Sequence, residues 1–205
     1  MCSMSTILLT STGISSDAVR DAFLKEAGEH RDQHIAIIVN AARDGQENKY
    51  VRLAEQQFRD LGFSSISFVD LDVDPLSLIQ EADIIYVVGG NTFTLLKKVM
   101  SSGADEILSD RLSTDSNLLY IGVSAGSIIL TPTIRIANEV EPDPNEEKLV
   151  DFSGLSIFPE EIYPHYTEDA EAELHEYETR HSVSVRRITN EEALLIKDGE
   201  TRLVS

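Results

Sequence analysis

The chain has 205 residues with 36 acidic and 17 basic side chains, so its formal net charge is −19. This charge argues against a nucleic-acid-binding surface, which needs a net basic face, and against docking on anionic membranes. The hydrophobic fraction of 41% is enough for a packed core and argues against global disorder. We expect a single domain that spans residues 1–205.

The cysteine count and the apolar segments exclude further classes of protein. The single cysteine, Cys2, excludes an intrachain disulfide framework and a cysteine-rich zinc site. No apolar stretch has the length of a membrane span, and the first residues lack the layout of a secretion signal. We therefore expect a cytoplasmic protein, a monomer or homodimer, that needs no metal or other cofactor.

Apolar runs alternate with helical patterns along the first two thirds of the chain. Continuous aliphatic runs are typical of strands that are buried on both faces. The predicted strands are, in chain order, Ser5–Ser11, His34–Asn40, Ser65–Leu71, Asp83–Val88 and Asn117–Val123. The predicted helices run from the capping residues Ser15–Asp17 to about Gly28, over Tyr50–Leu61, briefly after Asp74 and Pro75, and over Asn91–Met100.

The last third of the chain is more acidic. Glu139–Lys148 is acidic and contains prolines, which is typical of a surface loop. Thr167–Arg180 is predicted to form a helix whose acidic face is solvated. Ala193–Ile196 is an apolar run that predicts the last core strand. The whole alternation predicts an α/β fold, in which a mostly parallel sheet is covered by helices on both faces.

Ligands of such folds bind at the carboxyl ends of the parallel strands. Three turns lie there, namely Thr10–Gly13, Gly89–Thr92 and Gly122–Gly126. The last of these, Gly-Val-Ser-Ala-Gly, fits the G-x-S-x-G nucleophile elbow, and it follows an apolar strand as the elbow requires. Its glycines would let neighbouring backbone pack where a side chain would clash. Ser124 is therefore the candidate nucleophile, and the alternative is a glycine-rich turn without chemistry.

A serine nucleophile needs a base. Five histidines could supply it, namely His30, His34, His165, His175 and His181. His165 has the best setting, because it follows Pro164 at the end of a short apolar segment that is predicted to be a strand. The alternative for His165 is a partly buried histidine with a purely structural partner.

The two other turns suggest binding roles. Backbone N–H groups at Gly89–Thr92 are free to point at developing negative charge, so Gly90 could form an oxyanion hole together with the N–H of Ala125. In the alternative, Asn91 only caps the helix that it precedes. Thr10–Gly13 could cradle a phosphate, although a hydroxyl-rich turn after a first strand is common.

Taken together, these segments resemble the peptidase E family, the serine aspartyl dipeptidases, which are grouped with cyanophycinase-like hydrolases. The resemblance extends from about Asp70 to Ile196. It rests on the joint order and spacing of four segments, Val88–Phe93, Tyr120–Gly126, Thr131–Arg135 and Tyr163–Thr167. It implies a fold like that of the class I glutamine amidotransferases, a flavodoxin-like three-layer sandwich that is distinct from the α/β-hydrolases.

The resemblance also implies residue roles. Ser124 is the implied nucleophile, His165 the implied general base, and backbone groups at Gly90 and Ala125 the implied oxyanion donors. The family has a glutamate before its last core strand as the third member of the triad, and Asn190 stands at that position here. Asparagine can orient an imidazole but cannot supply a full charge. A small shift of register would bring Glu191 to the same place.

The implied substrate is a small peptide, in particular a dipeptide with an N-terminal aspartate. Arg180, in the segment Glu178–Arg180, matches an arginine with which the family binds the aspartyl side chain. Asn91 or an acidic side chain could accept a hydrogen bond from the free amine. The alternative for Arg180 is a surface ion pair with Glu176 at helical spacing. Acidic residues crowd both Glu139–Glu147 and Glu168–Glu178, so a site for acidic peptides must offset this field locally.

Three other functions stay open. A non-catalytic or weakly active family member would bind a small acidic ligand without hydrolysing it, which Asn190 favours. A flavodoxin-like module would bind a phosphate at Thr10–Gly13, but this leaves the elbow and His165 unexplained. Another serine acyl hydrolase, such as an esterase, is suggested by the chain's end at Ser205, soon after the last predicted strand.

Overall fold

A seven-stranded sheet with the order β3-β2-β4-β5-β1-β8-β9 forms the centre of the protein. The structure is a computed structural model that describes residues 5–140 and 142–205, so Cys2 lies outside the described residues. The parallel strands are β1 (Thr6–Thr10), β2 (Ile35–Ile38), β3 (Ile66–Val69), β4 (Ile84–Val87) and β5 (Leu119–Val123). Two antiparallel strands, β8 (Ala193–Lys197) and β9 (Glu200–Val204), extend the sheet beyond β1.

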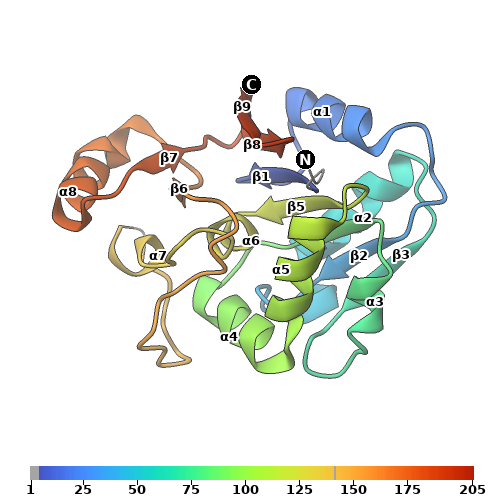
Figure 1. Cartoon of the computed structure of the whole chain (residues 1–205), viewed down its shortest axis with the longest axis horizontal. Helices are drawn as coiled ribbons and strands as arrows, with labels where there is room; N and C mark the ends of the chain where they lie inside the picture. Colours follow the sequence, from blue (N-terminus) through green and yellow to red (C-terminus); the bar gives the residue numbers. More distant parts are fainter. Residues whose placement is uncertain (1–4, 141) are drawn as a thin grey trace.

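Helices cover both faces of this sheet (Figure 1). One face carries α1 (Asp17–Ala27) and α2 (Lys49–Asp60), and the other carries α3 (Ser77–Gln80), α4 (Thr92–Ser102) and α5 (Ala104–Thr114). Every residue of β1, β2, β4 and β5 is buried, which explains why these strands are continuous apolar runs. The predicted mostly parallel α/β sheet is thus confirmed. Helix α5 was not predicted, because its apolar stripe is narrow.

Local sequence signals set the starts of α1 and α2. The side chain of Ser16 accepts from the N–H of Val19 at the start of α1, and Asn48 does the same for Tyr50 at the start of α2. Phe23 of α1 and Phe58 of α2 meet edge to face with ring centroids 5.6 Å apart. This aromatic contact joins the two helices over one face of the sheet, which adds about 1 kcal/mol beyond the buried area.

The C-terminal third builds a smaller unit beside the sheet, with helices α7 and α8 and strands β6 and β7 at the left of Figure 1. It comprises α7 (Ile136–Glu139), β6 (Glu161–Tyr163), the short helix η2 (Glu168–Ala170), α8 (Glu171–His181) and β7 (Val185–Arg187). Strands β6 and β7 pair in parallel. The predicted acidic helix is therefore present as α8, and only its Leu174 and Tyr177 are buried.

The chain connections place a crevice at the carboxyl edge of the sheet. Strand β2 continues into α2 on one face, whereas β4 continues into α4 on the other face. Adjacent parallel strands whose connections leave in opposite directions form a topological switch point, where α/β proteins bind ligands. The turns that follow β2, β4 and β5 all lie at this edge. None of the helices in residues 5–140 and 142–205 has the length and hydrophobicity of a membrane span.

Candidate active site

Ser124 occupies the turn between β5 and the four-residue helix α6 (Ala125–Ile128), with a strained backbone at φ 48° and ψ −106°. Such a conformation costs a side-chain-bearing residue of the order of 1–3 kcal/mol. Three backbone hydrogen bonds hold it in place. The Ser124 N–H donates to the carbonyl of Thr10 at 2.8 Å, and the Ser124 carbonyl accepts from Ser127 at 2.8 Å and Ile128 at 3.0 Å.

Close backbone packing explains the two glycines of the elbow. A Cβ on Gly122 would lie 2.6 Å from the carbonyl oxygen of Gly126, and a Cβ on Gly126 would lie 2.4 Å from that of Val87. Both distances are too short for any side chain. The steric reason for the G-x-S-x-G pattern therefore applies in this chain. Because α6 has only four residues, it has no long helix dipole to point at the site.

The turn after β4 packs directly against Ser124. A Cβ on Gly89 would lie 3.2 Å from the Cβ of Ser124, so a side chain at position 89 would crowd Ser124. Gly90 has φ 146° and lies so close to the carbonyl of Ala41 that a Cβ would be 2.0 Å from its oxygen. Within the described residues the N–H groups of Gly90 and Ala125 have no acceptor. Both donors are therefore available, one in the turn after β4 and one at the start of α6.

Asn91 lies at the pocket but its amide is already engaged. Its Oδ1 accepts from the N–H of Thr94 at 2.8 Å, so it caps α4. Its Nδ2 donates to the carbonyl of Pro144 at 2.9 Å. The structure thus places Asn91 as a helix cap that also ties down the acidic loop, and leaves little of its side chain for a substrate amine.

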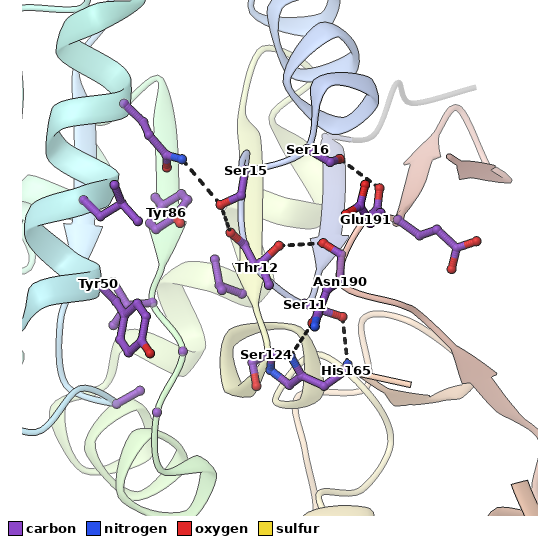
Figure 2. A pocket seen from close by; sticks show the side chains of 18 of the residues that line it. Ser11, Thr12, Ser15, Ser16, Tyr50, Tyr86, Ser124, His165, Asn190 and Glu191 are labelled. Carbon is purple, nitrogen blue, oxygen red and sulfur yellow. Dashed lines mark hydrogen bonds between the residues drawn. The ribbon is translucent and has the colours of Figure 1, made fainter. Parts of the chain in front are cut away.

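His165 follows β6 and is held by two hydrogen bonds on different parts of the residue. Its N–H donates to Oγ of Ser11 at 2.9 Å, and its Nδ1 lies 2.7 Å from Oδ1 of Asn190 (Figure 2). An amide oxygen can only accept, so Nδ1 carries the proton and Nε2 keeps its lone pair. The backbone of His165 is in the left-handed region at φ 58°. This arrangement presents Nε2 as the free basic atom of the ring.

Ser124 and His165 both line the same pocket and lie near each other in Figure 2. Each is half-buried. No hydrogen bond joins the two side chains, both of which belong to the described part of the chain. Hydrogen bonds between catalytic groups are commonly long in ligand-free enzymes and shorten when substrate binds.

The hydroxyl-rich turn after β1 holds His165 and Asn190, so the hydroxyl groups of Ser11 and Thr12 are not free for a phosphate. Ser11 Oγ donates to the carbonyl of Ile188 at 2.9 Å while it accepts from His165. Thr12 Oγ1 donates to the carbonyl of Asn190 at 2.7 Å, and Ser16 Oγ donates to that of Glu191 at 2.8 Å (Figure 2). These bonds set the register in which Asn190 faces the ring of His165. Sequence reasoning missed this role of Ser11 and Thr12.

The pocket has a volume of about 1270 Å³ and opens between the carboxyl edge of the sheet and the helices α1 and α2. The exposed side chains of Tyr50 and Leu53 and the buried Tyr86 form its apolar wall. Burial raises the pKa of Tyr86, so its phenol stays protonated. The charged side chains at the pocket are Asp17, Glu191, Glu192 and Arg43. Sequence reasoning missed Arg43, although it lies in the polar loop after a buried strand.

Arg180 lies elsewhere. It is exposed on α8 and does not line the pocket. Its guanidinium contacts Glu176 at 2.6 Å and Glu139 at 3.1 Å. Although partial burial opposes ionisation of Glu139, hydrogen bonds from His181 and Arg180 hold the pKa of Glu139 below its ordinary value. The surface ion pair with Glu176, the alternative given above for Arg180, is what this structure contains.

No group of three or more histidine, cysteine, aspartate or glutamate side chains in residues 5–140 and 142–205 is arranged to hold a metal ion. At one end of the pocket the structure brings together a serine, a histidine with a neutral amide partner, and free backbone N–H groups. This set of groups can perform acyl transfer: a nucleophile, a base and donors for an oxyanion.

Comparison with known proteins points in the same direction. A sequence model of peptidase family S51 matches residues 7–204. An uncharacterized peptidase of Pasteurella multocida is 30% identical over 198 residues, which cover 91% of each chain. Peptidase E of Salmonella typhimurium is 44% identical over 108 residues, and the match covers 52% of this chain but only 44% of that protein.

The fold has a counterpart among solved structures. A crystal structure described as a putative peptidase E protein from Listeria monocytogenes superposes with a TM-score of 0.79 at 23% identity, over 98% of both chains. A peptidase from an acI-B1 actinobacterium superposes with a TM-score of 0.66 at 16% identity. At these identities the likeness concerns the fold.

Proposed function

Because this chain belongs to peptidase family S51, we propose that it is a serine peptidase that hydrolyses small peptides, in particular dipeptides with an N-terminal aspartate, through an acyl-enzyme on Ser124. The family resemblance that the sequence motifs implied is confirmed by the same match. The observation that carries the proposal is the strained turn of Ser124 beside the His165–Asn190 pair, at the edge of one large pocket.

The proposed first step is acylation. Nε2 of His165 takes the proton of the Ser124 hydroxyl as its oxygen attacks the scissile carbonyl carbon. The carbonyl π electrons move to oxygen, and the N–H groups of Gly90 and Ala125 bind this oxyanion. Loss of one such donor costs about 3–4 kcal/mol of transition-state stabilisation in a well-studied serine protease. His165 then gives its proton to the leaving amine as the C–N bond breaks.

The second step is hydrolysis of the ester. A water molecule gives a proton to Nε2 of His165 and attacks the acyl carbon, and the oxyanion forms again at the same donors. The Ser124 oxygen leaves and regains the proton. Asn190 holds the ring in the useful tautomer throughout, but as a neutral group it stabilises the imidazolium less than a carboxylate would.

Two measurements that compare wild-type protein with the Ser124→Ala variant test the proposal. Wild-type protein should hydrolyse Asp-Leu, and Ser124→Ala should lose this activity by at least 10³-fold, as other serine peptidases do when the nucleophile is removed. A fluorophosphonate probe followed by peptide mass mapping should label Ser124. Ser113→Ala, which alters an exposed serine on α5, is the matched control and should behave as wild type. Equal hydrolysis by wild type and Ser124→Ala would remove Ser124 from the mechanism.

One alternative has specific support. Asn190 in place of a carboxylate, together with the lack of a hydrogen bond between Ser124 and His165 in the described chain, suits a member that binds a small acidic ligand without hydrolysing it. Such a protein would bind Asp-Leu in calorimetry, release no amino acid, and leave Ser124 unlabelled. Labelling of Ser124 with turnover of simple esters but not of peptides would instead indicate another serine acyl hydrolase.

A further inference from the structure

Arg43 follows β2 on a loop whose backbone is fixed. The N–H of Ala42 donates to the carbonyl of Val39 at 3.0 Å, and that of Gly45 donates to the carbonyl of Ala42 at 3.1 Å. Asn48 Nδ2 donates to the carbonyl of Arg43 at 2.9 Å. Hydrogen bonds on both sides of Arg43 therefore anchor its backbone at the pocket.

The side chain of Arg43 is exposed, and its guanidinium has no hydrogen bond or ion pair among the described residues. This distinguishes it from arginines such as Arg52 and Arg180, whose guanidinium groups contact glutamates. It is also the sole lysine or arginine among the residues that line the pocket in the described chain. An unpaired guanidinium in a cavity is a ready partner for a carboxylate, which it binds by two parallel hydrogen bonds.

The position of β2 in the sheet brings the loop that carries Arg43 close to Ser124. Strand β2 lies two positions from β5, with β4 between them, and neighbouring strands are about 4.8 Å apart. The loop before Arg43 touches the proposed oxyanion turn, because a Cβ on Gly90 would lie 2.0 Å from the Ala41 oxygen and 3.0 Å from the Ala42 nitrogen. This contact lies at the switch point between β2 and β4.

The direction of the reaction decides which part of the substrate meets Arg43. His165 must protonate the leaving amine, so the leaving residue lies on the side of β1 and β8, where the ring of His165 bonds to Asn190. With the leaving residue on that side, the acyl residue would extend from the scissile carbonyl in the opposite direction, toward β4 and β2. We propose that Arg43 binds the side-chain carboxylate of an acidic acyl residue and thereby sets the preference for N-terminal aspartate; this rests on the proposed function.

Electrostatics support this role. The chain has a net charge of −19, and Asp17, Glu191 and Glu192 line the same pocket. An acidic peptide that enters this field is repelled unless a local cation offsets it. Arg180 does not line the pocket, and both of its glutamate partners already engage its guanidinium. Arg43 is therefore the residue on which acceptance of an acidic substrate depends.

The test compares Arg43→Met with Arg202→Met, which changes an exposed arginine on β9 that does not line the pocket. The substrates are Asp-Leu, its neutral isostere Asn-Leu, and aspartyl-leucinamide, which lacks the C-terminal carboxylate. Arg43→Met should lower kcat/KM about 10- to 100-fold for Asp-Leu and aspartyl-leucinamide, mainly through KM, and less than twofold for Asn-Leu. Arg43→Lys should recover part of the loss, and Arg202→Met should match wild type on every substrate.

Two results would overturn the proposal. Equal losses on Asp-Leu and Asn-Leu would show that Arg43 does not read the side-chain charge. A loss confined to Asp-Leu, with aspartyl-leucinamide unaffected, would place the C-terminal carboxylate at Arg43 instead. Calorimetric binding of Asp-Leu and Asn-Leu to Ser124→Ala and to Ser124→Ala/Arg43→Met repeats the comparison without hydrolysis. The role of Arg43 can therefore fail while Ser124 is still labelled, or hold in a protein that does not turn over peptides.

Discussion

The contact between His165 and Asn190 gives the sharpest quantitative prediction. Asn190→Asp would place a carboxylate oxygen where Oδ1 now lies, 2.7 Å from Nδ1 of the ring. The side chain of Asn190 is exposed and the backbone carbonyl of Asn190 is held by Thr12. The substitution therefore adds one charge to the ring's partner without a change in packing, and tests what the missing carboxylate is worth.

The size of the effect follows from the distance and the exposure. Two unit charges about 4 Å apart attract each other by about 1 kcal/mol in water and about 4 kcal/mol at an effective dielectric of 20. Because Asn190 is exposed, a value near the lower end, about 1–1.5 kcal/mol, applies. Stabilisation of the imidazolium by this amount raises the plateau of kcat/KM by about five- to tenfold.

The assay is the pH dependence of kcat/KM for Asp-Leu. Asn190→Asp should raise the plateau and move the acidic limb to higher pH by about one unit, because a stronger base is protonated more readily. Asn190→Ala should lower the plateau about fivefold, since it removes one hydrogen bond worth about 1 kcal/mol. Glu191→Gln, which removes a charge one residue away from that contact, is the control and should leave the position of the acidic limb nearly unchanged.

The reasoning would be refuted by the opposite pattern. If Asn190→Asp and Asn190→Ala both leave the plateau and the acidic limb unchanged, the contact seen in the structure does not orient His165 for the proposed reaction. If Glu191→Gln produces the change instead, the register of the segment before β8 shifts by one residue during catalysis.

Three further substitutions test the supporting structure. Gly126→Ala should lower the free energy of unfolding by about 3 kcal/mol, because the new Cβ overlaps a strand carbonyl; an unchanged thermal midpoint would contradict this. Ser11→Ala should lower kcat but not KM, since the backbone of His165 loses its buried acceptor; a change in KM alone would contradict it. Hydrogen bonds from Arg187 hold the pKa of Glu178 below its ordinary 4.5, so this pair stabilises the fold above that pH and loses its effect as the pH falls. Glu178→Gln should therefore lower stability by about 1–2 kcal/mol at pH 7 in denaturant unfolding, and the difference from wild type should shrink in acid; a constant difference would contradict the assignment.

Local patterns in the sequence determined the core of the fold. The aliphatic runs that form β1, β2, β4 and β5 are buried along their whole length. Because strands buried on both faces need apolar residues at every position, the sequence alone predicts a sheet that is covered on both faces. The elbow at Ser124 is also recognisable from the sequence, because its two glycines have fixed positions around the serine. Gly122 is required by close packing on Gly126, and Gly126 by close packing on Val87 of the neighbouring strand. The strand-end position of His165 was local information of the same kind.

Contacts between distant segments decided the rest. Whether Asn190 or Glu191 faces the base depends on hydrogen bonds from Thr12 and Ser16, which are more than 170 residues away in the chain. The Glu-Thr-Arg segment suggested Arg180 as the substrate residue, but α8 places Arg180 outside the pocket. There its guanidinium forms an ion pair with Glu176, one helical turn earlier. The loop after β2 places Arg43 in the pocket instead, at the switch point where the connections of β2 and β4 leave to opposite faces of the sheet. Short-range patterns encode elements, whereas the side chains that meet across a pocket are selected by packing between elements, which no spacing along the chain reveals.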